Sequence, residues 1–206
     1  MTDPPPIWLL AKAAGGGADL TATFALSRAL TREAAELWPE WWHAELFGPP
    51  HREADLRPLE QLHAGLKRLG LVRRRARKLH ATKRGRELLE RPGELMAWMA
   101  ADLGGEAASF ADAVGEAVVD ALMRSDSLRI DELEHAVYKV ISRQGWRDFA
   151  GNQPDLDDVR WQAIDVVSRG EGYGLIAWER GIGERSKVSV TPVGQRAIAM
   201  AWDHVT

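Results

Sequence analysis

The strongest indication of fold in this chain is one stretch, GLVRRRARKLHATKRGRELL, residues 70–89. After Leu71 the stretch turns strongly basic, and on its return Leu79 and Ala81 alternate with polar neighbours, which is typical of a half-buried β-hairpin. Thr82 suits the N-cap of a following helix, because its hydroxyl can accept a backbone N–H. The stretch therefore predicts a basic hairpin that leads into a closing helix.

The same pattern returns in the second half of the chain, in GLIAWERGIGERSKVSVTPVGQRAI, residues 174–198. Both stretches begin with Gly-Leu and a β-branched residue, pass through a polar hairpin, and reach Thr with Gly three positions later. The later copy has turn residues at 181–184 and a helix start at Thr191-Pro192, with Thr as N-cap and Pro at the first helical position. The spacing of the two stretches predicts a chain built from two copies of one unit.

Each hairpin follows an amphipathic helical pattern. In LRPLEQLHAGLKRL, residues 56–69, the leucines recur at spacings of three and four and so fall on one helical face. In DLDDVRWQAIDVVSRG, residues 155–170, apolar residues repeat this spacing, with Asp155 or Asp157 as the cap. Each half therefore reads as three helices, a two-stranded hairpin and a closing helix. The other helical patterns cover residues 21–30, 31–47 (broken by Pro39), 107–123 and 130–142.

The basic stretch also carries a family resemblance. LKRLGLVRRRARKLHATKRGRELLERPGELMAWM, residues 66–99, resembles the paired winged-helix repeats of proteins from high-GC Gram-positive bacteria. GGGADLTATFAL, residues 15–26, is similar to the Gly-rich turn and Leu-Thr entry of that family, although Phe24 replaces the turn residue usual there. The resemblance is good over residues 17–103 and only architectural over residues 107–203.

This resemblance implies a mainly α (α+β) fold of two tandem winged-helix repeats, each with a hairpin wing, and it brings no catalytic residues. More distantly, the chain looks like the winged-helix domains of bacterial transcription regulators, which implies DNA binding by analogy of fold only. We expect an N-terminal extension over residues 1–16, a first repeat over residues 17–105 and a second over residues 106–206.

Charge is distributed unevenly between the two repeats. Residues 52–91 hold 13 Lys/Arg against 5 Asp/Glu, whereas the whole chain has a net charge of −3. Arginine and lysine in such numbers neutralise phosphates, so the first hypothesis is a non-enzymatic protein that binds nucleic acid, most simply duplex DNA, through the first repeat. The alternative is a solvated edge, because long basic side chains are common on exposed surfaces.

The nucleic-acid hypothesis assigns positions to the basic residues. The third helix would present the face opposite its leucines to a major groove, while the hairpin and the start of the closing helix would lie on the phosphate backbone. The candidate nucleic-acid-binding residues are Arg57, Gln61, Lys67, Arg68, Arg73, Arg74, Arg75, Arg77, Lys78, His80, Lys83 and Arg84.

The second repeat differs in charge. Residues 106–206 hold 11 Lys/Arg against 17 Asp/Glu, and phosphate repels an acidic helix face. The second hairpin, with Trp178 and Ile182, suits a protein contact or self-association, or simply packing. A protein-interaction adaptor built from winged-helix repeats is therefore the rival hypothesis.

Other functional classes find little support. The chain has no cysteine, no serine lies in a nucleophile-elbow motif, and no phosphate-loop motif occurs. The histidines show no metal-ligand spacing, so we expect no metal, no cofactor and no enzyme activity. No apolar stretch approaches the length of a membrane span, so we expect a cytoplasmic protein with no membrane partner. The histidines are His43, His51, His63, His80, His135 and His204.

The segment WPEWWHAELF, residues 38–47, clusters three tryptophans. Trp38, Trp41 and Trp42 fall at i, i+3 and i+4, so a single helical face could present them to a partner or to the interior. We favour packing in the seam between the repeats, because indole rings bury a large apolar area.

Overall fold

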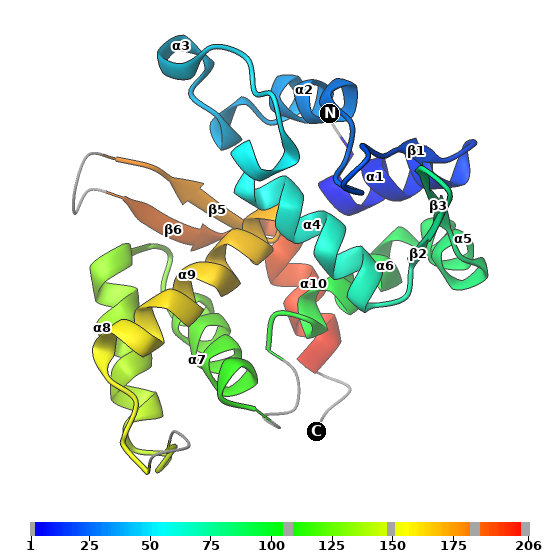
Figure 1. Ribbon diagram of the computed structural model, residues 1–206. Helices are drawn as coiled ribbons and strands as arrows, with labels where there is room; N and C mark the ends of the chain where they lie inside the picture. Colours follow the sequence, from blue (N-terminus) through cyan, green and yellow to red (C-terminus); the bar gives the residue numbers. More distant parts are fainter. Residues whose placement is uncertain (1–2, 105–108, 148–150, 182–185, 203–206) are drawn as a thin grey trace. The chain divides into compact units, whose positions relative to one another are not determined.

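The computed structural model describes residues 3–104, 109–147, 151–181 and 186–202. The chain is mainly helical and carries two small antiparallel sheets, which makes it an α+β protein (Figure 1). Contacts divide it into a first unit, Met1–Met96 with Gly172–Gly174, and a second unit, Ala97–Glu171 with Leu175–Thr206. The domain boundary expected near residue 105 falls outside the described residues and stays a prediction.

The first unit runs helix, strand, helix, a region of short turns, helix, hairpin and helix. Its elements are α1 (Pro5–Ala14), β1 (Ala18–Asp19), α2 (Arg28–Leu37), the 3₁₀ turn η1 (Pro39–Trp41), α3 (Ala44–Phe47), the 3₁₀ turn η2 (Glu53–Asp55), α4 (Arg57–Arg68), β2 (Val72–Arg75), β3 (Lys78–Ala81), α5 (Lys83–Leu89) and the start of α6 (Pro92–Ala101).

Among the described residues, the second unit repeats this order without the region of short turns. After the end of α6, its elements are α7 (Phe110–Met123), β4 (Leu128–Arg129), α8 (Ile130–Ile141), α9 (Leu156–Gly172), β5 (Ile176–Glu179), β6 (Lys187–Val190) and α10 (Pro192–Trp202).

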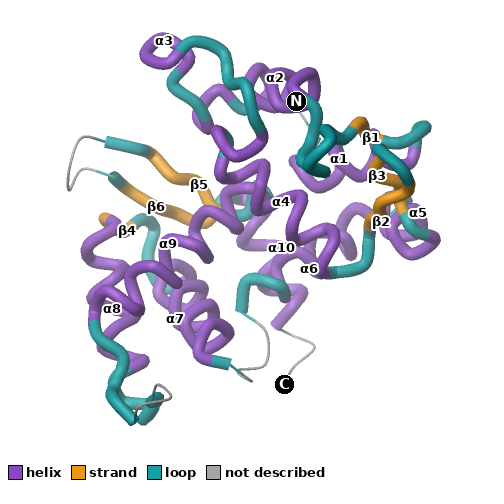
Figure 2. Tube along the Cα trace, viewed as in Figure 1, coloured by secondary structure: helices purple, strands orange, loops and turns teal. Residues whose placement is uncertain are grey.

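Each unit contains one three-stranded antiparallel sheet, with strand order β1-β3-β2 in the first and β4-β6-β5 in the second (Figure 2). The sequence predicts both hairpins but neither third strand. β1 and β4 are two residues long, which is too short to show the alternation by which a strand is recognised. In each unit the short strand lies beside the returning strand of the hairpin.

The N-terminal segment is part of the first unit, whereas the sequence analysis separates it as an extension. Trp8, Leu9 and Leu10 of α1 are buried, and the helix packs against α4, α5 and β3. Prolines occupy its first turn, where the missing N–H has no helical partner in any case. The apolar residues of this segment therefore belong to the core of the first unit.

The helix predicted over residues 21–30 is wrong in its first part. Residues 21–25 form a tight turn, in which the N–H of Thr21 donates to the carbonyl oxygen of Ala25 at 2.8 Å. Phe24 has φ 66, a left-handed conformation that ends any right-handed helix. α2 begins only at Arg28, after Ser27 accepts the N–H of Leu30 as its cap.

The tryptophan segment is not one helix. α2 ends at Leu37, because Pro39 leads the chain into a 3₁₀ turn. Trp38 and Trp41 are buried and stacked, with ring centroids 4.8 Å apart, while the half-buried Trp42 donates its indole N–H to Gly48 instead. Two of the three indoles therefore fill the interior of the first unit.

The repeated Gly-Leu and Thr-x-x-Gly motifs form the same local structure twice. Gly70 and Gly174 have φ 68 and 69, the left-handed region that favours glycine. The N–H of Thr82 donates to the carbonyl oxygen of Leu71 at 2.9 Å, and Thr191 makes the same bond to Leu175 at 2.9 Å. The predicted caps are confirmed, because the hydroxyls of Thr82 and Thr191 accept the N–H of the glycine three residues on.

Those glycines are required by close packing. A Cβ on Gly85 would lie 2.1 Å from the carbonyl oxygen of Leu71, and a Cβ on Gly194 would lie 2.1 Å from that of Leu175. The closing helix of each unit can therefore approach its hairpin only where no side chain intervenes.

The leucine stripe of α4 is confirmed as the core of the first unit. Four of its five predicted members have no exposed surface, and the fifth, Leu69, is half-buried. His63 is buried on the same side, where its Nδ1 lies 2.8 Å from a carboxylate oxygen of the buried Glu53. The four fully buried leucines are Leu56, Leu59, Leu62 and Leu66.

Candidate nucleic-acid interface

The β2–β3 hairpin sorts its basic residues onto two faces. Arg73 pairs with His80 and Arg75 pairs with Lys78 in register, so these four side chains share one face of the sheet. Arg74 lies opposite the fully buried Leu79 and points to the other face. One face is therefore basic across both strands, and the other carries the buried Leu79 and Ala81 beside the exposed Arg74.

The basic face is open to solvent. Arg73, Arg75 and Arg77 are exposed, and they make no ion pair with any residue in the described ranges. Lys78 has an acidic neighbour, since its Nζ lies 3.5 Å from a carboxylate oxygen of Asp19 on β1. Charges without partners are available to phosphate groups.

The hairpin tip is a two-residue turn. Ala76 adopts φ 54 between the paired residues Arg75 and Lys78, which suits the tight turns that join antiparallel strands. Arg77 follows it, and the carbonyl oxygen of Arg77 accepts the N–H of Leu20 at 2.9 Å. The end of β1 is thereby fixed beside the tip.

Arg74 has an aromatic partner that the sequence analysis does not identify as functional. Its guanidinium carbon lies 3.7 Å from the centroid of the Phe24 ring, which is close enough for a cation–π interaction. The two residues are 50 positions apart, and no local sequence signal links them. The one hint in the sequence is that Phe24 departs from the turn residue expected from the family that this stretch resembles.

His80 is the least accessible candidate on the hairpin. It is half-buried, and its ring lies so close to Gly17 that a Cβ there would meet the imidazole Cε1 at 2.8 Å. Gly17 thus leaves space for the imidazole. His80 packs at the base of the basic face and adds little exposed surface to it.

Three of the four candidates on α4 are exposed, namely Arg57, Lys67 and Arg68. Arg57, Glu60, Ala64 and Lys67 are exposed and follow one another at helical spacing, so they form an outward stripe. Gln61 is half-buried and borders that stripe, four residues after Arg57 and three before Ala64. The stripe therefore consists of two cations, one carboxylate and one alanine.

Arg68 lies beside the segment Gly172–Gly174, which belongs to the first unit. Arg68 as a whole is exposed, but its guanidinium donates a hydrogen bond to the hydroxyl of the buried Tyr173 at 3.2 Å. A Cβ on Gly65 would lie 1.9 Å from that hydroxyl oxygen. The segment covers this side of α4, and one hydrogen bond of Arg68 is made within the unit.

Two further cations lie in the first turn of α5. Lys83 and Arg84 are exposed, and Lys83 has only a long i,i+4 contact of 3.8 Å with Glu87. Cations at a helix N-terminus oppose the helix dipole. The helix dipole therefore does not favour either cation at this position.

The second hairpin places different chemistry at the equivalent positions. Ala177, Trp178 and Glu179 of β5 stand where Arg73, Arg74 and Arg75 stand in β2, counted from the Gly-Leu pair. Ile182 and most of the predicted turn at 181–184 lie outside the described residues. This hairpin has no equivalent of the three adjacent arginines.

Arg180 of the second hairpin is bound internally. Arg180 donates twice to the carboxylate of Glu171, at 2.6 and 2.7 Å, and Glu171 is 3% exposed. The guanidinium also lies over the Trp178 ring, at 4.6 Å from the centroid. Arg180 therefore stabilises the second unit and is not available to phosphate in the way that Arg73 is.

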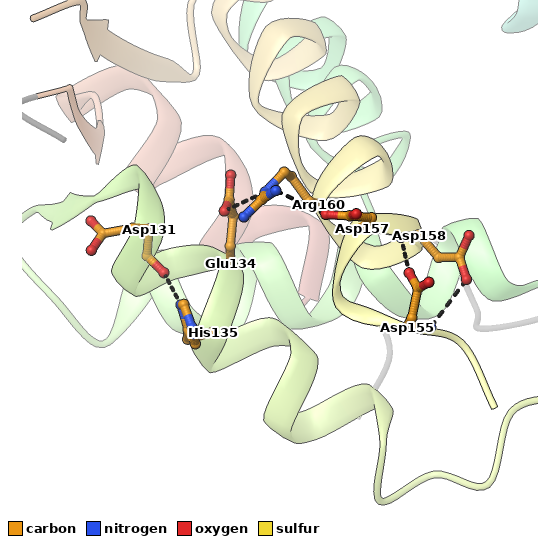
Figure 3. Close-up of polar contacts among 7 residues, drawn as sticks. All are labelled: Asp131, Glu134, His135, Asp155, Asp157, Asp158 and Arg160. Atoms are coloured by element: carbon orange, nitrogen blue, oxygen red, sulfur yellow. Dashed lines mark hydrogen bonds and ion pairs between the residues drawn. The ribbon is translucent and has the colours of Figure 1, made fainter. Parts of the chain in front are cut away.

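The acidic residues of α8 and α9 are used as caps and ion pairs. Figure 3 shows Arg160 between Glu134 and Asp157, at 2.9 and 2.8 Å. The hydrogen bond and the charge of Glu134 raise the pKa of Arg160 above its ordinary value. Asp155, one of the two predicted caps, exchanges backbone-to-carboxylate hydrogen bonds with Asp158 at the start of α9.

The histidines do not gather into a metal site within the ranges that the structure covers. His135 in Figure 3 contacts the carbonyl oxygen of Asp131 at 2.7 Å, and no group of three or more His, Asp or Glu side chains in those ranges could hold a metal ion. Among the same residues, none of the helices combines the length and the apolar character that crossing a bilayer requires.

Comparison with known proteins bears on the first unit alone. Residues 7–94 match the family model described as the Y4jL N-terminal domain. The match begins inside α1 and ends inside α6, so it includes the N-terminal helix and the whole basic hairpin. No curated protein and no solved structure matches the chain.

Proposed function

We propose that this protein is a non-enzymatic DNA-binding protein, possessing two winged-helix repeats and contacting duplex DNA through the first. The observation that carries the proposal is the open basic face of the first hairpin, where Arg73, Arg75 and Arg77 have no ion-pair partner among the described residues. Transcription regulation is the function that such binding would serve.

The order of elements supports the winged-helix part of the proposal. In each unit a hairpin follows a helix and is joined by a short third strand from the N-terminal part of the unit. A winged helix has this order, with the helix before the hairpin as the recognition helix and the hairpin as the wing.

The charges suggest how the hairpin and α4 would each contribute to DNA binding. Lys78 and the arginines of the hairpin would hold phosphates, which supplies affinity independent of sequence. On α4, Arg57 and Lys67 would approach the DNA from the exposed stripe, while Gln61 would contribute less because it is half-buried. Specificity would therefore be modest beside the phosphate term.

A protein-interaction adaptor is the second candidate, and the second unit supports it. Trp161 on α9 is 67% exposed. An open groove of about 440 Å³ lies between α7, α8 and α10, lined by apolar residues that include Met123, Val140 and Ile198. Exposed aromatic and apolar surface of this kind is typical of protein contacts.

Fluorescence anisotropy with a labelled random duplex, measured across a salt series, tests the proposal. The variant with Arg73, Arg74, Arg75, Arg77 and Lys78 all replaced by alanine should bind every duplex more weakly. The slope of log affinity against log salt should also become flatter, by about 0.9 for each phosphate that the variant no longer neutralises.

The matched control is Lys187→Ala, at the position of the second hairpin that corresponds to Lys78. This control should bind DNA like the unmodified protein. Unchanged affinity in a folded five-alanine variant would contradict the proposal and would favour the adaptor.

A further inference from the structure

Phe24 lies beside the tip of the basic hairpin. The turn that contains it continues directly from Leu20, whose N–H donates to the carbonyl oxygen of Arg77 at the tip. The guanidinium carbon of Arg74 lies 3.7 Å from the ring centroid. An aromatic ring therefore lies against one cation of the hairpin, on the face opposite Arg73 and Arg75.

The core does not account for this ring. Phe24 is 42% exposed, while Leu20 and Leu26, on either side of the turn, fill the adjoining buried positions. Its backbone is left-handed at φ 66, a conformation that a bulky residue adopts at an energetic cost. The fold thus holds a strained, exposed aromatic residue where a small turn residue would serve.

An aromatic ring next to phosphate-binding cations suits a particular ligand. A planar nucleobase stacks favourably on an aromatic side chain, and an arginine in contact with that ring adds a cation–π contribution. In a fully paired duplex both faces of each base are covered by its neighbours. Only an unpaired base can leave the stack and reach the ring.

We propose, building on the DNA binding proposed above, that Phe24 and Arg74 form a stacking platform for one unpaired base. The nucleic-acid backbone next to this base would pass the hairpin tip, where Arg77 would hold a phosphate. The protein would then bind a duplex that contains an unpaired base more tightly than the same duplex fully paired.

The test compares two duplexes that differ by one unpaired 2-aminopurine. The protein should bind the duplex with the unpaired base at least about fivefold more tightly, the lower end expected for one stacked base. The fluorescence of 2-aminopurine should rise on binding, because the base leaves its neighbours in the duplex.

Variants assign the effect to the ring. Phe24→Leu should keep the affinity for the paired duplex and lose the preference, whereas Phe24→Tyr, which restores an aromatic ring, should keep the preference. Phe47→Leu is the matched control, since Phe47 is a 65% exposed phenylalanine of the same unit and should behave like the unmodified protein.

The outcomes separate this inference from the function on which it rests. Equal affinity for the two duplexes, or a preference that survives in Phe24→Leu, would overturn the stacking platform and leave duplex binding intact. Failure to bind either duplex would overturn both proposals.

Discussion

The two hairpins of this protein have the same backbone plan and opposite uses for their charged residues. In the first, Arg73 and Arg75 extend from an open face without ion-pair partners in the described ranges. In the second, Arg180 is bound by the buried carboxylate of Glu171 and lies over Trp178. The same fold thus presents a cationic surface in one unit and an internal ion pair in the other.

This difference indicates that the backbone and the surface are specified by separate residues. Gly70, Gly85 and Thr82 have equivalents in Gly174, Gly194 and Thr191, and these positions determine how the closing helix meets the hairpin. The side chains between them are not constrained by this geometry. The charges of the two hairpins can therefore differ without a change in the backbone.

The largest effect should come from the shared backbone plan. Gly85→Ala and Gly194→Ala should each lower the free energy of unfolding by about 3 kcal/mol, because the new Cβ meets a backbone carbonyl that cannot move freely. Gly93→Ala, at an open position, is the control and should be neutral or slightly stabilising. Urea denaturation measures all three, and a cost in only one unit would contradict the equivalence of the two plans.

The next effect separates the two kinds of arginine. Arg180→Ala should destabilise the protein by about 2 kcal/mol, since it leaves the buried carboxylate of Glu171 without its bidentate partner. Arg73→Ala should change stability by less than about 0.5 kcal/mol, because the side chain is exposed. Thermal unfolding would contradict the comparison if both variants lost stability equally.

Exchanging the hairpin residues tests whether charge alone distinguishes the units. Arg73→Ala combined with Arg75→Glu copies the second hairpin into the first and should weaken duplex binding about tenfold, or about 1.4 kcal/mol. The reverse exchange, Ala177→Arg with Glu179→Arg, is then added to that variant. Anisotropy should show that it restores only part of the lost duplex affinity. A full recovery would show that the second unit lacks only charge.

The smallest effect concerns a cation of the first unit that is already paired. Lys12 lies 2.7 Å from Glu33. Burial alone would raise the pKa of Glu33, but hydrogen bonds from Lys12 and Trp8 outweigh it and hold that pKa below its ordinary value. Ionised Glu33 therefore stabilises the folded state above its unfolded pKa of about 4.3, and this contribution is lost as pH falls through the lower folded pKa.

Glu33→Gln should accordingly cost about 0.5 kcal/mol at neutral pH, a small value because both side chains are partly exposed. The difference from the unmodified protein should shrink below pH 4 and should be absent in strong acid. DNA affinity should not change, since the pair lies outside the hairpin. A cost that persists unchanged in acid would contradict the assignment to this carboxylate.

Much of the local structure can be predicted from the sequence. Leucine spacing identifies α4 and its buried face, and Thr-x-x-Gly identifies both closing helices with their caps. Asp155 is identified as one of two caps for α9. These features depend on residues within about one turn of each other, so the sequence contains the whole interaction.

The remaining features depend on residues that are far apart in the chain. β1 has only two residues and exists because β3, about 60 positions later, supplies its hydrogen-bond partners. The contacts of Phe24 with Arg74 and of Tyr173 with Arg68 likewise join residues that are far apart in the chain. The helices, caps and hairpins are thus legible in the sequence because their interactions are local. Which basic residues are open, stacked or covered is set by the tertiary fold, because exposure depends on what distant segments pack against them.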